Sequence, residues 1–526
     1  MRSISRADLY ATAAMVLGAT LLLLYLASVY DVEHFYVTKQ RFNIMSNDQV
    51  GYLTTARWLA ETGELRSHLI YPAYVSEPGW RLYMPGIYCV LAVGHILFGD
   101  GPIAWRMPSL LSFIVATVGV FLIGRRFYGR PSGVVAALLF MLFPPIAVFA
   151  FTAMPQLPFT AAGVTAFCIF AYLSPRLRPF FVPPLLVIPF LFRETGALLV
   201  IPMALIVIGD RGGRSWMTLL VSGLAAVALL SGVLAWQTAS GKASLPLGRA
   251  MGGTFNYDDA FPPASPPITF STVRDGLGRN ISRNMEMLGR RLDRRDNVVV
   301  PLAILCVVAV IALMRGATRD ADGKSDPLAS GAGFLFIAAV AVVTALYTWH
   351  LYRGMRAVLF TWPLLAVSIA PWIVSTLERS GRMLEKRVSK LAAVVPAILF
   401  LILTLWVAHW GSLRLARAFD QTAGKQVVAL MESFKLADSG VLVAPPSFSL
   451  DYVLRHYPIR YSFIPRNDET LRLLAEKHSI QAVILGKSDP KNLLSERAIE
   501  GLGLVRVRNF RLPWTGEEFK LFQRPI

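Results

Sequence analysis

The stretch "AWRMPSLLSFIVATVGVFLIGRRFYG", residues 104–129, holds an apolar run followed at once by Arg125 and Arg126. A helix needs about 20 apolar residues to cross the hydrocarbon core of a bilayer, and this run is long enough. Similar runs recur in a chain of 526 residues that is 55% hydrophobic and only 16% charged. Soluble domains carry about 25% charged residues. Since the mean hydropathy is also high, at +0.52, we predict a polytopic α-helical membrane protein.

The apolar runs predict about eleven transmembrane helices. Residues 9–29 are too long for the core of a cleavable signal, and no small-residue cleavage site follows, so we interpret them as a permanent first span. The predicted spans are 9–29, 103–124, 132–151, 158–174, 180–192, 196–209, 216–236, 297–314, 328–348, 356–376 and 391–409.

The net charge of +19 reflects 52 basic and 33 acidic residues. In a soluble protein this excess would indicate nucleic-acid binding. In a membrane protein, basic residues gather in cytoplasmic loops and beside lipid headgroups, so we expect no nucleic-acid partner. The three cysteines, Cys89, Cys168 and Cys306, lie in apolar runs, which predicts inert core residues rather than disulfides or a zinc site.

Charge also predicts the topology. The short connections that share a basic character contain Arg2 and Arg6, Arg125, Arg126 and Arg130, Arg176 and Arg178, Arg211 and Arg214, Arg315, Arg319 and Lys324, and Arg379, Arg382, Lys386, Arg387 and Lys390. With the spans counted as above, all of them fall on one side, which the positive-inside rule makes cytoplasmic. We therefore expect a multi-pass protein of the cell (inner) membrane with a cytoplasmic N-terminus. The long loops 30–102 and 237–296 and the C-terminal tail are then extracytoplasmic.

One apolar stretch, "YMPGIYCVLAVGHILFG" at residues 83–99, would invert the rest of the topology if it crossed the membrane. It is short and contains His95, so we interpret it as a helix along the outer face. An amphipathic helix at 49–62 is its expected companion. Together they predict a structured platform inside loop 30–102.

The composition changes in the tail, residues 410–526. "SGVLVAPPS" and "IQAVILGKS" are buried-strand patterns bounded by turn residues, and "DETLRLLAEKHS" is an amphipathic helix opened by Asp468 and Glu469. "LGLVRVRNF" and "EFKLFQ" resemble an antiparallel pair. The chain is thus expected to divide into a membrane domain, 1–409, and a small extracytoplasmic α/β domain, 410–526.

Polar residues that suit chemistry collect at the predicted outer ends of the spans, whereas the span interiors are nearly free of charge. The candidates are Asp48, Tyr52, Glu77, Arg81, Tyr83, Gln156, Arg193, Glu194, His350, Arg353 and Arg356. Spacing alone leaves other interpretations open. Asp48 suits a helix N-cap, and Glu77 suits a solvated loop.

Two further alternatives concern the basic candidates. Arg193 and Glu194 suit an ion pair at a helix turn. Arg353 and Arg356 suit cations that snorkel to headgroups. A cluster of such residues at one membrane face indicates an enzyme whose substrate has a lipid tail and a polar head.

Several motifs resemble those of the GT-C glycosyltransferases that use polyprenyl-phosphate sugars, a group with the protein O-mannosyltransferases and the transferases of aminoarabinose to lipid A. The family places an acidic pair, then a Tyr and an amphipathic helix ending in "ETG", in its first outer loop. Here "NDQVGYLTTARWLAETGEL" supplies Asp48, Tyr52 and that ending, and "YMPGIY" matches the next helix start. Residues 104–129 and "GVVAALLFMLFPP" (133–145) resemble the second and third spans with their basic turn.

The resemblance implies an inverting transfer of a sugar from a polyprenyl-phosphate donor to a hydroxyl of a glycolipid, glycan or protein, with Asp48 as general base. The other candidates except His350 would bind substrate. Two departures stand out, because Gln49 replaces the second acid of the pair and Gln156 stands where the family often has an Asp. Metal-binding relatives use outer-face acidic and His residues, for which Glu77, His68 and His350 are the candidates. We assign no metal, although the family allows a divalent ion.

Two other classes of function stay open at this level. A transporter or flippase for a lipid-linked sugar would need a polar route across the bilayer, for which the spans hold few polar residues. A noncatalytic homologue that binds lipid-linked sugar would fit the loss of the acids at Gln49 and Gln156.

Overall fold

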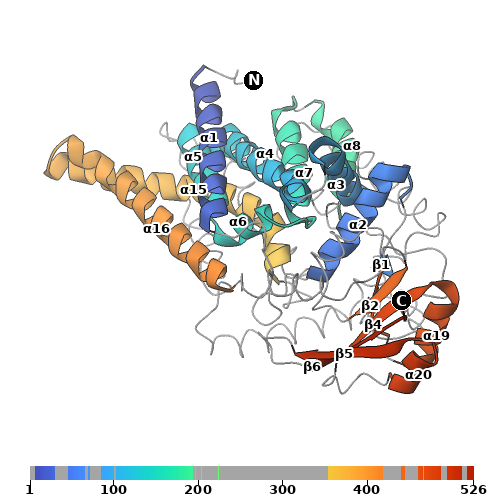
Figure 1. Ribbon diagram of the computed structural model, residues 1–526. Coiled ribbons are helices and arrows are strands. Elements are labelled where there is room, and N and C mark those ends of the chain that lie inside the picture. The colour runs from blue at the N-terminus through green and yellow to red at the C-terminus, as the bar shows by residue number, and fades with distance from the viewer. Residues whose placement is uncertain are drawn as a thin grey trace, which may run out of the picture. The chain divides into compact units, whose positions relative to one another are not determined.

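The computed structural model describes residues 6–29, 46–65, 69–70, 85–99, 102–174, 176–193, 354–418, 440–444, 460–465, 467–486, 494–511 and 518–525, with the single residues 196, 199, 203 and 223. The backbone alone is described for 29, 46–51, 69–70, 102–104, 144–145, 148, 354–361, 411–418, 460–461 and 463. The predicted spans 297–314 and 328–348, most of 196–209 and 216–236, and loop 237–296 lie outside this part of the chain. The described elements divide into two compact units, and Figure 1 shows them as helices and arrows.

Unit 1 is helical. Its elements are α1 (Arg6–Val29), nearly all of α4 (Pro102–Tyr128), α5 (Arg130–Met141), α6 (Pro144–Ala150), α7 (Gln156–Tyr172), α8 (Arg178–Phe190), α15 (Gly354–Arg387), the 3-10 helix η4 (Leu391–Val394) and α16 (Val395–Ala418). Within the described part of the chain, three segments are long and apolar enough to cross a membrane, namely Arg6–Ser28, Trp105–Tyr128 and Leu391–Trp410. They coincide with predicted spans.

Two predicted boundaries are wrong. The span expected at 132–151 is two helices, α5 and α6, because Pro144 and Pro145 lack the N–H groups that would continue the ladder. The span expected at 356–376 belongs to a longer helix, since α15 runs on to Arg387 through the exposed basic residues Arg379 and Arg382.

Small residues and one tryptophan determine how the helices of unit 1 pack. A Cβ at Gly133 of α5 would lie 2.6 Å from the carbonyl oxygen of Phe121 in α4, so α4 and α5 approach each other closely. Trp362 of α15 donates its indole N–H to the carbonyl oxygen of Leu139 at 3.0 Å and stacks on Phe143 with 4.1 Å between ring centroids. The beginning of α15 therefore lies toward the end of α5.

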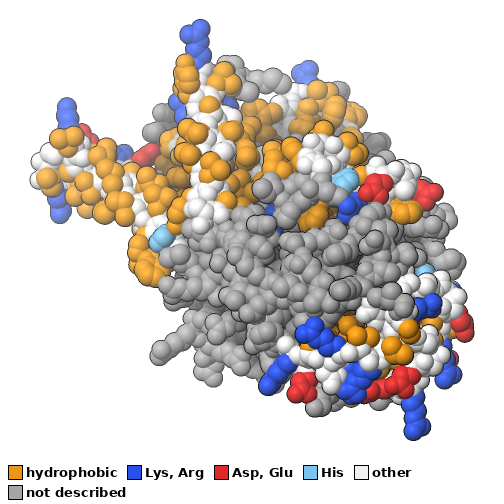
Figure 2. All heavy atoms as spheres, viewed as in Figure 1, with side chains coloured by type: hydrophobic (Ala, Val, Ile, Leu, Met, Phe, Trp, Pro, Cys, Tyr) orange, Lys and Arg blue, Asp and Glu red, His pale blue; other side chains and the backbone are white. Residues whose placement is uncertain are grey.

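Helix α16 exposes nearly its whole apolar surface. Leu399, Leu403 and Trp406 are exposed, and Figure 2 shows hydrophobic side chains along α16 and α1. Near its end, His409 Nδ1 lies 2.5 Å from the hydroxyl of Tyr25 in α1. An apolar face of this kind is what a lipid-facing helix of a membrane protein presents.

Unit 2 holds two helices of the first loop, α2 (Ser46–Thr62) and α3 (Pro85–Phe98), and a sheet. The two helices pack on each other, with the rings of Tyr52 and Tyr88 5.9 Å apart. Helix α2 ends at Gly63, whose φ of 73° is a left-handed C-cap conformation. Both helices occupy the segments in which the sequence predicts them.

The sheet has six strands in the order β1-β3-β2-β4-β6-β5. They are β1 (Leu69–Ile70), β2 (Val441–Ala444), β3 (Arg460–Phe463), β4 (Ile480–Gly486), β5 (Val505–Arg511) and β6 (Glu518–Gln523). The first four in this order run parallel, while β6 pairs antiparallel with β4 and β5. Strands β1 and β3 were not predicted, and β1 comes from the first loop rather than from the tail.

Two short helices accompany the sheet. Helix α19 (Asp468–Lys477) buries Leu471 and Leu474 in a core that includes Val443, Val483 and Phe522. Its N-cap is Asn467, whose side chain accepts from the N–H of Thr470.

Asp468 lies in the first turn of α19, as the sequence predicts, and it also contacts a second helix. Its carboxylate accepts from the N–H and hydroxyl of Ser495, at 2.8 and 2.7 Å. Ser495 is the N-cap of α20 (Glu496–Glu500). One side chain therefore ties the beginnings of both helices together.

Candidate functional site

Asp48 lies in the first turn of α2. The helix begins at Ser46, so Asp48 is its third residue rather than its N-cap. The positive end of a helix favours a carboxylate in this turn. Tyr52 follows one turn later, with its side chain 2% exposed and its ring against Tyr88.

Packing around Tyr52 determines the orientation of α2 on α3. Thr55 and Ala56 are buried on α2, as are Tyr88 and Leu91 on α3. Toward the C-terminal end of α2, Glu61 is exposed and forms an i,i+4 ion pair with Arg57 at 3.4 Å. Among the described side chains of α2, those of residues 52–56 are buried.

Gln156 begins α7 in unit 1, and its side chain is 2% exposed. Among the residues that the structure describes, neither Oε1 nor Nε2 of Gln156 has a hydrogen-bond partner. Its backbone carbonyl accepts from the hydroxyl of Thr160 at 2.7 Å. A buried carboxamide without partners costs roughly 1–3 kcal/mol per polar group. Buried polar groups in native proteins nearly always have a hydrogen-bond partner, so Gln156 is an exception that calls for an explanation.

Helix α4 lies next to the beginning of α7. The hydroxyl of Ser109 in α4 donates to the carbonyl oxygen of Thr152, in the turn before α7, at 2.6 Å. One turn before Ser109 lies Arg106, which is only 9% exposed. Arg106 was not among the residues predicted from the sequence, although an arginine inside an otherwise apolar predicted span is a signal of function.

Two other predicted site residues are described in unit 1. Helices α7 and α8 pack on each other, with Arg178 at the start of α8 donating to the carbonyl oxygen of Ala171 in the last turn of α7, and Arg193 follows the other end of α8. Arg356 is the third residue of α15 and lies six residues before Trp362. The predicted residues that lie outside the described part of the chain are His68, Glu77, Arg81, Tyr83, Glu194, His350 and Arg353.

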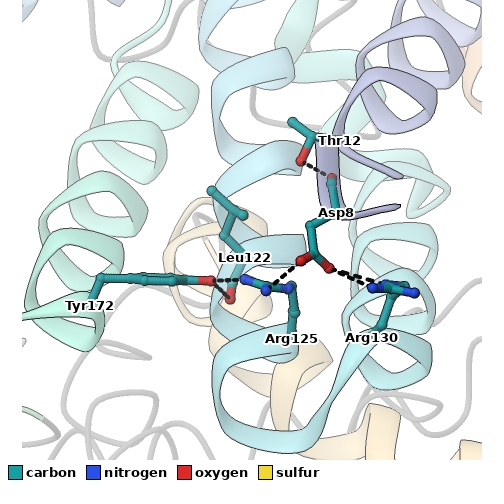
Figure 3. A network of polar contacts seen from close by, with 6 residues as sticks. All are labelled: Asp8, Thr12, Leu122, Arg125, Arg130 and Tyr172. Atoms are coloured by element: carbon teal, nitrogen blue, oxygen red, sulfur yellow. Dashed lines mark hydrogen bonds and ion pairs between the residues drawn. The ribbon is translucent and has the colours of Figure 1, made fainter. Parts of the chain in front are cut away.

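The opposite end of unit 1 is held by a buried ion network (Figure 3). Asp8 is 2% exposed and accepts from Arg125 at 2.6 Å and from Arg130 at 3.1 Å. Arg125 also donates to the hydroxyl of Tyr172 at 3.0 Å, and that hydroxyl donates to the carbonyl oxygen of Leu122. Helices α1, α4, α5 and α7 are thereby tied together.

The last turn of α7 adds two more cations to this end. The carbonyl oxygen of Ala171 accepts from Arg126 at 3.2 Å and from Arg178 at 2.9 Å. Cations are favoured at helix C-termini. The basic residues that the sequence assigns to cytoplasmic loops therefore include buried structural ones, since Arg178 is only 3% exposed.

The described residues also bear on a metal site. Within the described ranges, no group of three or more His, Cys, Asp or Glu side chains is placed to hold a metal ion. The side chains of Asp48 and Glu77 are not among those described. At Gln156 the donor is a neutral carboxamide, which attracts a cation less than the carboxylate that the family often has there.

The chain is similar to one protein family in sequence and to several solved structures in fold. Residues 78–236, which contain α3 to α8, match the model of a family described as dolichyl-phosphate-mannose-protein mannosyltransferase. The apo oligosaccharyltransferase of Archaeoglobus fulgidus aligns with a TM-score of 0.51 and 13% identity, over 91% of this chain and 70% of that one. ArnT of Cupriavidus metallidurans in its apo state covers 98% of both chains, with a TM-score of 0.47 and 13% identity. No curated protein matches the chain significantly.

The family match and the solved structures support different conclusions. At 13% identity the archaeal structure shows a shared fold alone. The family match adds a similarity in sequence, over the segment in which the second and third span motifs lie. Residues 78–236 are therefore similar to the protein-mannosyltransferase family, and the chain shares a fold with the archaeal oligosaccharyltransferase, in keeping with the resemblance seen in the motifs.

Proposed function

We propose that the protein transfers a sugar from a polyprenyl-phosphate carrier to a hydroxyl of an extracytoplasmic glycolipid, glycan or protein. The observation that carries the proposal is the match of residues 78–236 to a family whose description names dolichyl-phosphate-mannose. The position of Asp48 in the first turn of α2 supports it, because that turn is where a helix favours an ionised acid.

Asp48 is the proposed general base. As the acceptor oxygen bonds to the anomeric carbon, its hydroxyl proton passes to the carboxylate. The bond from that carbon to the phosphate oxygen breaks, and its electron pair leaves with the polyprenyl phosphate. The transition state resembles an oxocarbenium ion, as in other glycosyl transfers. Attack opposite the phosphate inverts the anomeric centre.

The leaving phosphate gains negative charge, so fixed cations stabilise the transition state. We take Arg193, which follows α8, and Arg356, in the first turn of α15, as these cations, together with Arg106, which is buried in α4. The carboxamide of Gln156 both donates and accepts, which suits a sugar hydroxyl or a phosphate oxygen. The remaining proposed substrate contacts come from the sequence alone and are Tyr52, Glu77, Arg81, Tyr83, Glu194 and Arg353.

A transfer assay in membranes tests the proposal. Synthetic polyprenyl-phosphate sugars are supplied, and the released polyprenyl phosphate is measured for the wild type, Asp48→Asn and Glu61→Gln. Removal of a general base costs about 10²–10⁴ in rate. We therefore expect Asp48→Asn to lose transfer.

Glu61→Gln is the matched control, because Glu61 is an exposed acid on the same helix. It is expected to keep wild-type transfer. Near wild-type release by an Asp48→Asn protein that inserts normally would refute the assignment of the base.

A further inference from the structure

The first loop and the tail share one sheet. Strand β1 pairs in parallel with β3, with Leu69 opposite Tyr461 and Ile70 opposite Ser462. These segments lie near opposite ends of the chain. The pairing adds a strand from the loop that carries Asp48 to the sheet of the tail (Figure 1).

Without β1, strand β3 would be the edge of the sheet. Strand β2 covers the other side of β3, and Ser462 in β3 is fully buried. An uncovered edge leaves unpaired N–H and C=O groups, which proteins cover or pair. The two residues of β1 supply that cover, so the loop completes the sheet.

Strand β1 is also tied closely to α2. The helix ends at Gly63, whose N–H donates to the carbonyl oxygen of Leu59 at 2.9 Å, and residues 64–68 alone separate Gly63 from Leu69. A connection this short spans at most about 20 Å when extended. Helix α2 also contacts β1 directly and packs on α3 through Tyr52 and Tyr88.

We propose that the β1–β3 pairing is a positioning device, through which the tail sheet sets the place of α2 and hence of Asp48. The inference rests on the proposed function of Asp48. The backbones of Leu69 and Ile70 are the positioning groups, and they act on the reaction only through α2. An error of about 1 Å in the position of a catalytic group lowers a rate by as much as about 10²-fold. A longer and more flexible connection between α2 and β1 should therefore lower the rate of transfer even when β1 still pairs with β3.

A disulfide tests the register in the full-length protein. Cα atoms of neighbouring strands lie about 4.8 Å apart, within the range that a disulfide bridges. In a background without the three native cysteines, Leu69→Cys with Tyr461→Cys should cross-link and keep transfer. Leu69→Cys with Phe463→Cys is the matched control, and its offset of two residues should prevent the bond. Failure of the first pair to cross-link would overturn the pairing.

Insertion of four glycines after Glu64, with the Leu69→Cys and Tyr461→Cys pair present, separates positioning from folding. The cross-link reports that β1 still pairs with β3. We expect kcat to fall about tenfold or more, with the KM for the donor changed by less than about twofold. The same insertion after Gly503, an exposed turn of the tail, should leave kcat unchanged.

The outcomes distinguish this inference from the proposed function. An unchanged kcat in the cross-linked Glu64 insertion, beside an inactive Asp48→Asn, would overturn the positioning role alone. Full activity of Asp48→Asn would overturn the assigned base. A loss of kcat in the Glu64 insertion, with kcat retained in the Gly503 insertion, supports positioning.

Discussion

Among single residues, Gln156 stands out because its carboxamide is buried and neither of its polar atoms has a hydrogen-bond partner among the described residues. It was a candidate from its place in the sequence, but its 2% exposure and lack of described hydrogen-bond partners were not predictable, because both depend on helices far away in the chain. A polar group left unpaired in a packed interior lowers stability.

We expect Gln156→Met to leave stability unchanged or to raise it by about 1–3 kcal/mol, because the apolar side chain removes two unpaired polar groups at similar volume. Transfer should fall at least about tenfold. Thermal unfolding in detergent and polyprenyl-phosphate release measure the two effects. Thr117→Val, a buried substitution in α4 whose native hydroxyl donates to the carbonyl oxygen of Phe113, is the control and should keep transfer. Full transfer by Gln156→Met would make Gln156 a packing residue only.

The Asp8 network predicts an effect on stability. Asp8→Asn leaves Arg125 buried without its carboxylate, and breaking a buried pair costs about 3–5 kcal/mol. The partner Arg130 is 47% exposed, so Arg130→Gln should cost about 1 kcal/mol or less. The unfolding temperatures of both variants in detergent measure the difference. Equal losses would mean that Asp8 and Arg125 are not the core of the network.

At the scale of elements, hydrophobic runs sufficed to predict most described helices, because an apolar run of span length has few other solutions. Strand β1 could not be predicted from the sequence, because two residues are too few to show a periodic pattern. Its partner strand, β3, lies far away in the tail, so no local signal indicates the pairing. The pair Pro144 and Pro145 predicts the break between α5 and α6, but a prediction from hydropathy alone does not take prolines into account.

Two glycines of the tail sheet differ in a way that can be measured. Gly440 and Gly503 both have positive φ, at 109° and 75°, so alanine strains the backbone at either position by about 1–2 kcal/mol. A Cβ at Gly440 would also lie 2.3 Å from Cγ of Gln481 and 2.8 Å from the carbonyl oxygen of Ser479. At Gly503 nothing lies within 4 Å.

We therefore expect Gly440→Ala to destabilise the protein more than Gly503→Ala. Chemical unfolding followed by the intrinsic fluorescence of a tryptophan introduced into the tail core, for instance Phe522→Trp, compares the two. Equal losses in the free energy of unfolding would mean that backbone strain alone determines the destabilisation. The site of Gly440, just before β2, would then have room for a methyl group.

At the scale of the whole molecule, the charge pattern predicts which segments share a side of the membrane. The contacts of Asp8 with Arg125 and Arg130, and of Arg126 and Arg178 with Ala171, bring three predicted cytoplasmic segments to one end of unit 1. Segments that share one side of the membrane must lie at the same end of the helical unit, so these contacts agree with the predicted topology. Which side of the membrane that end faces stays a prediction, since charge bias rather than packing determines orientation.

Cysteine labelling tests the orientation. In the cysteine-free background, a membrane-impermeant maleimide applied to intact cells should label Glu476→Cys, on the exposed face of α19, and not Arg176→Cys in the α7–α8 turn. After permeabilisation both should react. The reverse pattern in intact cells would invert the topology.

We propose that this chain is a polyprenyl-phosphate-dependent glycosyltransferase with Asp48 as its general base. Mass spectrometry of envelope glycolipids and glycans tests both parts of the proposal, in a deletion strain complemented with either the wild-type or the Asp48→Asn protein. We expect a glycosylated species to disappear on deletion, to return with the wild-type protein and to stay absent with Asp48→Asn at equal membrane abundance. Return of that species with Asp48→Asn would refute the assignment of the base, and an envelope unchanged by the deletion would refute the proposed transfer.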